Sequence, residues 1–151
     1  MKALLLSTLL STSAFAACPD LSGKYAACRS ITGDSAGSTD MVVTQVLKNG
    51  VVTYTITATD NGTNERTTDT YRADGRSYTT TETMPDTDLK IVTTINVSCV
   101  GNTAVQRLVA SAEGQEMANV VSTMAKVGKQ LLNETVGTIF GSAIADKVIC
   151  E

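Results

Sequence analysis

The sequence contains no histidine and no tryptophan, and aromatic residues make up only 4% of its 151 residues. The absence of histidine excludes Ser-His and Cys-His nucleophilic catalysis, histidine general bases and histidine metal ligands. The shortage of aromatic rings leaves little on which nucleic-acid bases or sugars could stack. The sequence also lacks a glycine-rich phosphate loop and a dinucleotide-binding fingerprint. We therefore expect a protein that is not an enzyme and that holds no cofactor and no metal.

Charge is also sparse, with 18% charged residues and a formal net charge of -3. No cluster of Lys and Arg occurs anywhere in the chain. A nucleic-acid-binding domain usually carries a basic patch, so we do not expect nucleic acid as a partner. The length fits one domain, and the composition is that of a globular chain rather than a fibrous or disordered one.

The first 16 residues have the features of a secretory signal peptide. Lys2 provides the positive charge, residues 3–10 form a mostly apolar run, and Ala14-Phe15-Ala16 is a small-x-small cleavage site. The apolar run is too short to span a bilayer, and no later stretch approaches the ~18 apolar residues of a membrane helix. We expect cleavage after Ala16, a single β-barrel domain over residues 17–151, no transmembrane segment, and a periplasmic or secreted location.

The four cysteines predict two disulfides. Cys18, Cys28, Cys99 and Cys150 make an even set in an exported chain, and no C-x-x-C spacing suggests redox chemistry. Three pairings are open. Cys99 ends a predicted strand and Cys150 lies in the predicted last strand, so joining them closes a long loop. We therefore favour Cys99–Cys150 together with Cys18–Cys28.

Cys18 has an alternative interpretation as a lipid attachment site. Phe15-Ala16-Ala17-Cys18 partly matches the sequence at which bacterial lipoproteins are cleaved and lipidated, with Phe where Leu is usual. Lipidation would leave an odd number of cysteines for disulfides. The lipoprotein is therefore the minority alternative.

Regular turn signals and alternating side chains predict an antiparallel sheet. Asn49-Gly50, Asn61-Gly62 and Asp74-Gly75 are strong hairpin signals, and turn signals recur at intervals of roughly 11–15 residues. Between them, residues 51–58 alternate between apolar side chains and threonines, and residues 89–98 follow a similar pattern. Such alternation is typical of strands with one buried face and one wet face. The fold class is therefore all-β.

Residues 115–140 can be interpreted as helix or strand. Their apolar side chains also fit helical spacing, but glycines such as Gly128 would each weaken a helix by about 1 kcal/mol. We predict a hairpin of residues 118–126 and 129–136, followed by a strand at 143–150. A short C-terminal helix is the alternative.

The segment Leu21-Ser22-Gly23-Lys24-Tyr25 resembles the Gly-x-aromatic opening of lipocalin-like (calycin-type) proteins, with Tyr where lipocalins usually have Trp. Small exported bacterial proteins that open with Cys-Pro-x-Leu-x-Gly-x-Tyr are also similar. The resemblance implies an up-and-down meander of about 8–10 strands that closes into a barrel. A bond between Cys99 and Cys150 would resemble a common lipocalin disulfide.

A barrel built from this composition should retain an internal cavity. Phe is 2 and Trp is 0, so small side chains would fill the interior of about ten strands incompletely. We expect a small, mostly apolar ligand in that cavity. Arg107, if it points inward, could pair with a ligand carboxylate. The candidate ligand contacts are Tyr25, Tyr54, Ile56, Tyr78, Ile95 and Arg107.

A protein-binding module is the alternative function, for example a periplasmic or secreted inhibitor of a hydrolase. Such a module would have a filled core and a distinctive exposed loop, for which the Gly/Ser/Thr-rich segment 32–40 is the candidate. A carboxylate-based enzyme would instead need two acidic side chains that converge in a cleft, and the sequence names no such pair.

Overall fold

The structure is a computed structural model that describes residues 18–32, 37–85 and 87–151. The expected signal peptide and part of the segment 32–40 lie outside these residues. The described chain forms ten strands and no helix. They are β1 (Gly23–Ser30), β2 (Thr39–Lys48), β3 (Val51–Asp60), β4 (Arg66–Ala73), β5 (Ser77–Thr83), β6 (Lys90–Val100), β7 (Thr103–Ala112), β8 (Gln115–Val127), β9 (Gln130–Ile139) and β10 (Ser142–Cys150).

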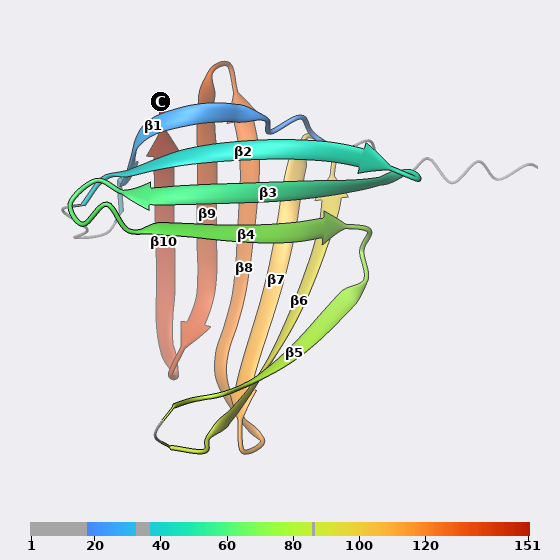
Figure 1. Cartoon of the computed structure of the whole chain (residues 1–151), viewed down its shortest axis with the longest axis vertical. Helices are drawn as coiled ribbons and strands as arrows, with labels where there is room; N and C mark the ends of the chain where they lie inside the picture. The colour runs from blue at the N-terminus through green and yellow to red at the C-terminus, as the bar shows by residue number, and fades with distance from the viewer. Residues whose placement is uncertain (1–17, 33–36, 86) are drawn as a thin grey trace, which may run out of the picture.

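All ten strands belong to one antiparallel sheet with the order β4-β3-β2-β1-β10-β9-β8-β7-β6-β5. The sheet is strongly curled into an open half-barrel, in which β1–β4 run crosswise over β6–β10 (Figure 1). The predicted all-β meander is confirmed. The predicted closure is not, because β4 and β5 are the two edges and the described chain has no ladder between them.

The sheet turns its corner within β1. The ladder with β2 shifts its register between Tyr25 and Cys28, where Ala27 has a φ of 49°. Beyond this bulge, Arg29 pairs with Ile149 of β10. Bulges bend a strand, and strands that pass between crossed layers turn at such points. β1 therefore belongs to both layers.

Residues 115–140 are strands, so the helical alternative for this segment is not observed. β8 and β9 form the predicted hairpin around Gly128, and β10 follows. Gly137 lies within β9 with a φ of 153°, and a Cβ there would lie 2.1 Å from the carbonyl oxygen of Asn119 in β8. Only glycine allows the two backbones to approach this closely.

The hydrophobic core lies where the two layers cross. Side chains from both layers and from the segment before β1 contribute to it: Leu21, Tyr25, Cys28, Val43, Val52, Tyr54, Ala104, Met124, Leu131 and Cys150. Burying one large apolar side chain contributes roughly 1.5–3 kcal/mol. This cluster therefore holds the crossing layers together.

The segment before β1 satisfies the polar tips of the two core tyrosines. The Tyr25 hydroxyl donates to the carbonyl of Leu21, and the Tyr54 hydroxyl donates to the carbonyl of Pro19, each at 2.8 Å. The Tyr25 ring turns back over Gly23, where a Cβ would lie 2.8 Å from the ring. The Gly-x-Tyr spacing therefore follows from close packing.

The two disulfides join the two layers. Cys18–Cys99 ties the segment before β1 to the end of β6, and Cys28–Cys150 ties β1 to β10. The prediction that all four cysteines form disulfides is confirmed, but the favoured pairing of Cys99 with Cys150 and Cys18 with Cys28 is wrong. Since β1 and β10 are neighbours in the sheet, Cys28 lies beside Cys150, and the length of the closed loop does not decide the pairing.

Two disulfides indicate an oxidising, extracytoplasmic environment. No helix in the described part of the chain could cross a membrane. The sulfur of Cys18 is bonded to Cys99, and the same sulfur cannot also carry a lipid thioether.

Peptide mapping without reduction should identify Cys18–Cys99 and Cys28–Cys150. These bonds span 81 and 122 residues, and loops of this length restrict the unfolded chain by roughly 4–5 kcal/mol each in the chain-entropy model. Replacing either pair by serine should therefore lower the urea midpoint strongly. A Cys18–Cys28 peptide would contradict the structure.

The substitution Gly137→Ala should destabilise the fold by about 1–3 kcal/mol, because β8 and β9 must move apart to admit the new Cβ. Gly37→Ala is the control, since a Cβ at that position meets no atom within 4 Å. Urea unfolding measures both. Equal stability of the two variants would show that the approach of β8 and β9 is not tight.

Candidate functional site

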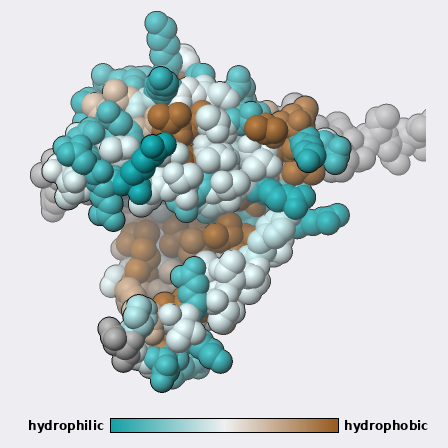
Figure 2. Space-filling model, in the orientation of Figure 1, coloured by the Kyte–Doolittle hydropathy of each residue, from teal (hydrophilic) through white to brown (hydrophobic). Residues whose placement is uncertain are grey.

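The crossing layer is too narrow to cover the concave face of β6–β10. Strands β6, β7 and β8 contain 11, 10 and 13 residues, or about 33–43 Å at the usual rise per residue. Four strands side by side span only about 19 Å. Figure 2 shows the result: apolar surface is visible in the hollow below the crossing layer. Roughly half of the concave face therefore lies outside the core.

The side chains of the concave face form three rows across β6–β10. The register defines a core row of Cys99, Ala104, Met124, Asn133 and Val148. Next comes a polar belt, which consists of Val97, Gln106, Ser122, Thr135 and Asp146. An apolar row follows, which consists of Ile95, Leu108, Val120, Gly137 and Ile144.

The polar belt, which is apolar only at Val97, marks the lower boundary of the core, and its four polar members have hydrogen-bond partners. Ser122 and Thr135 share a hydrogen bond of 2.9 Å between their hydroxyl oxygens. Asp146 accepts hydrogen bonds from the hydroxyls of Ser30 and Thr32. Because these groups are satisfied within the protein, the belt separates the packed core from the uncovered apolar row.

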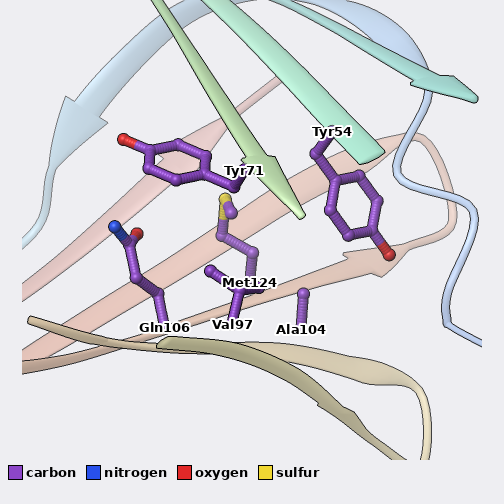
Figure 3. Close-up of a pocket in the computed structure, with 6 residues that line it drawn as sticks. All are labelled: Tyr54, Tyr71, Val97, Ala104, Gln106 and Met124. Atoms are coloured by element: carbon purple, nitrogen blue, oxygen red, sulfur yellow. The ribbon is translucent and has the colours of Figure 1, made fainter. Parts of the chain in front are cut away.

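Above the belt, the space between the layers is filled. The rings of Tyr54 of β3 and Tyr71 of β4 lie on one side of this space, and Met124, Val97 and other side chains approach from the opposite layer (Figure 3). No cavity large enough for a water molecule remains between them. Burial raises the pKa of Tyr54 to about 12. Because Tyr54 is fully buried and its hydroxyl donates to the carbonyl of Pro19, it is a core residue with a satisfied hydroxyl.

A groove of about 410 Å³ opens between β4 on one side and β5 and β6 on the other. The side chains of Tyr71, Tyr78, Thr80, Ile95 and Val97 line it, together with the β4 residues 69–72. Ile95 is also the first member of the apolar row, so the groove continues into that row. From here on, the term open groove means this hollow of about 410 Å³ together with the apolar row.

The turn between β4 and β5 does not lead into a hairpin of these two strands. The open groove therefore stays open between them. The Gly75 amide donates to the carbonyl of Val97 at 2.9 Å, and the Asn96 side chain donates to the carbonyl of Gly75 at 2.6 Å. These bonds fix the Asp74-Gly75 turn to β6. β4 and β5 leave the turn in different directions (Figure 1).

Charged and aromatic groups surround the part of the open groove between β4 and β5, which we call its mouth. Arg72 forms an ion pair with Asp74 at 3.4 Å, and its guanidinium lies 5.6 Å from the centre of the Tyr78 ring. The Tyr78 hydroxyl donates to Asp74, which holds the pKa of that carboxyl below its usual range. The same bond raises the pKa of Tyr78.

Tyr71 connects the mouth to the core. Burial and the neighbouring charge of Asp69 raise the pKa of its hydroxyl, which also interacts with the side chain of Gln106. Tyr71 pairs with the buried Tyr54 across the β3–β4 ladder. Its position is therefore set by the core, while its ring lines the open groove.

The structure brings together only two of the ligand contacts that the sequence suggested. Tyr78 and Ile95 are direct partners across the β5–β6 ladder, and both line the open groove. Tyr25 and Tyr54 are buried in the core, and Ile56 packs against it. Arg107 is exposed on the convex face, so the condition under which it could contact a ligand, an inward orientation, is not met.

Sequence reasoning missed Asp69, Tyr71 and Val97 at the mouth, and Leu108 and Val120 in the apolar row. The alternation in β4 and β6 could have indicated the first three, because Asp69 and Tyr71 share one face and Val97 shares a face with Ile95. In β7 apolar residues occur on both faces, so alternation alone does not choose the inward one.

Comparison of the chain with protein-family models, with curated proteins and with solved structures finds no match in any of the three.

Proposed function

We propose that the protein is an exported carrier that binds a small, mostly apolar ligand in the open groove. The observation that carries this proposal is the apolar row, which extends across five strands and adjoins a hollow of about 410 Å³. Ile95, Leu108, Val120 and Ile144 are all partly exposed there. Apolar surface that is gathered in a concavity with a few polar groups is typical of ligand sites.

The position of the open groove also supports a lipocalin-like mode of binding. A closed barrel of eight strands is already wide enough to hold one small ligand. Here the half-barrel is open between β4 and β5, and the ligand would occupy the place where these strands would otherwise meet. The bound ligand would then complete the core below the polar belt.

The proposed location is the periplasm or the exterior of the cell, after cleavage of the signal peptide. The two disulfides and the features of residues 1–16 support it. Intact mass spectrometry of the exported protein tests it. A mass that corresponds to residues 17–151 with two disulfides supports the proposal, and added acyl chains contradict it.

A protein-binding module remains the second candidate, and one observation favours it. β4 and β5 each have an unpaired edge in the described chain, and a strand of another protein can pair with such an edge. Proline substitutions in one of these edge strands would weaken the binding of such a partner. They would leave the uptake of a small apolar molecule largely unchanged.

The variant Leu108→Gln should bind an apolar naphthylamine fluorophore about tenfold more weakly than the unmodified protein. Leu108 lies in the apolar row between Ile95 and Val120, and losing its contact removes roughly 1.5 kcal/mol or more of apolar burial. Fluorescence titration gives the dissociation constant. Val109→Gln is the matched control, because Val109 is the next residue and lies on the convex face, 38% exposed.

Equal weakening by both variants would place the fluorophore elsewhere on the protein. Failure of the unmodified protein to take up any apolar fluorophore would reject the carrier and favour the protein-binding module.

A further inference from the structure

The turn between β9 and β10 has an unexpected residue for its geometry. Phe140 and Gly141 form the two-residue loop between these strands, with φ angles of 48° and 75°. The Asn49-Gly50 turn between β2 and β3 is also a two-residue loop, with φ angles of 53° and 76°. Asparagine followed by glycine is the usual sequence for such a turn, because both residues tolerate a positive φ. The β9–β10 turn therefore has phenylalanine where its geometry favours asparagine.

Phenylalanine is strained in this conformation. Six non-glycine residues in the described part of the chain have a positive φ, and Phe140 is the only aromatic one among them. A bulky side chain rarely adopts a positive φ, and a strained residue persists only where its surroundings hold it. Here the amide of Phe140 donates to the carbonyl of Met117 in β8 at 2.7 Å, which fixes the turn.

Burial of the ring does not offset this strain. Phe140 is 74% exposed, the highest value among the large apolar side chains in the described residues. The only other phenylalanine of the chain, Phe15, lies in the predicted signal peptide. A single exposed apolar side chain is ordinary, but one that is also strained stabilises neither the core nor its own turn. The two features together point to a contact outside the folded chain.

The concave face that carries the open groove continues to this turn. Ile139 follows Gly137 of the apolar row by two residues, so it lies on the same concave face. Ile139 is 38% exposed. The register places it in a further row across the sheet, whose other members are uncharged: Ala118, Ala110 and Thr93. The β5–β6, β7–β8 and β9–β10 turns lie together at this end of the molecule (Figure 1).

The charges at this end select the kind of surface that it can approach. In the described residues, the segments 84–90, 112–116 and 139–143 contain the carboxylates of Asp88, Glu113 and Glu116 and one cation, that of Lys90. Anionic lipid surfaces attract basic segments and repel acidic ones. A zwitterionic surface therefore fits this end better than an anionic one.

We propose that this end of the protein docks on a zwitterionic phospholipid bilayer, with the ring of Phe140 inserted among the headgroups. This inference rests on the proposed carrier function and adds the surface from which the apolar ligand is collected. Aromatic and aliphatic side chains at a bilayer surface are stabilised by the apolar area that they bury there. The contact explains why the turn retains a strained phenylalanine in place of asparagine.

The absence of tryptophan from the chain allows a direct test. Phe140→Trp introduces a single tryptophan at the turn. Leu47→Trp is the matched control, because Leu47 is 69% exposed beside the Asn49-Gly50 turn of the crossing layer. Each variant is mixed with phosphatidylcholine vesicles without any ligand. The emission of Phe140→Trp should shift to shorter wavelength as the ring leaves water, and that of Leu47→Trp should not. Anionic phosphatidylglycerol in the vesicles should weaken the shift.

The variant Phe140→Asn separates the membrane contact from the fold. Asparagine suits the positive φ, so this variant should unfold at the same urea concentration as the unmodified protein or at a higher one. Its partition onto phosphatidylcholine vesicles, measured by co-sedimentation, should fall about five- to tenfold, as expected for the loss of one partly buried ring. Its affinity for the naphthylamine fluorophore in solution should not change, because Phe140 lies outside the apolar row.

The membrane contact would be overturned by no shift for Phe140→Trp, an equal shift for both tryptophan variants, a preference for anionic vesicles, or undiminished partition of Phe140→Asn. A shift that grows with protein concentration without vesicles would place a second copy of the chain at this turn and would also overturn it. None of these results bears on the carrier function, which fails only if the unmodified protein takes up no apolar fluorophore.

Discussion

The structure depends on a mismatch between the width of one layer and the length of the other. Four strands laid crosswise cover only the upper part of strands that are ten or more residues long in β6, β7 and β8. Where the layers overlap, the core is filled and its tyrosine hydroxyls are satisfied by the carbonyls of Pro19 and Leu21. Where they do not overlap, the same strands continue to present aliphatic side chains to an open space. One sheet thereby supplies both the core and the candidate site.

The boundary between these regions is chemical as well as geometric. The polar belt lies between the core row and the apolar row. Its polar side chains make hydrogen bonds within the protein, to one another, to Ser30 at the end of β1 and to Thr32 after it. A buried polar group without a partner is costly, so a satisfied belt allows the core to end there. The turn at Gly75 also helps to separate the core from the open groove, because its hydrogen bonds to β6 keep β4 and β5 apart.

Much of the fold could be predicted from local patterns, because strand alternation and Asn-Gly turns are local properties. The β2–β3 turn at Asn49-Gly50 and the β8–β9 hairpin illustrate this. Asp74-Gly75 is also a turn, but whether its strands pair depends on bonds to distant β6. The disulfide pairing and the orientation of Arg107 depend on register across the sheet. Tyr78 and Ile95, which line the open groove, could be named from the sequence because tyrosine is rare in this chain and the strand of Ile95 alternates clearly. Leu108 could not, because its strand has apolar residues on both faces.

The interleaved connectivity of the disulfides has a consequence for biosynthesis. Cys18 and Cys28 leave the ribosome first and are only ten positions apart in the sequence, yet each is bonded to a partner made much later. If oxidation simply followed the order of emergence, it would join these two to each other and trap the chain in a non-native form. Cys150 in the final strand must be synthesised before Cys28 of β1 can form its native disulfide. Maturation therefore requires either that early thiols stay reduced or that a thiol-disulfide exchange catalyst corrects them.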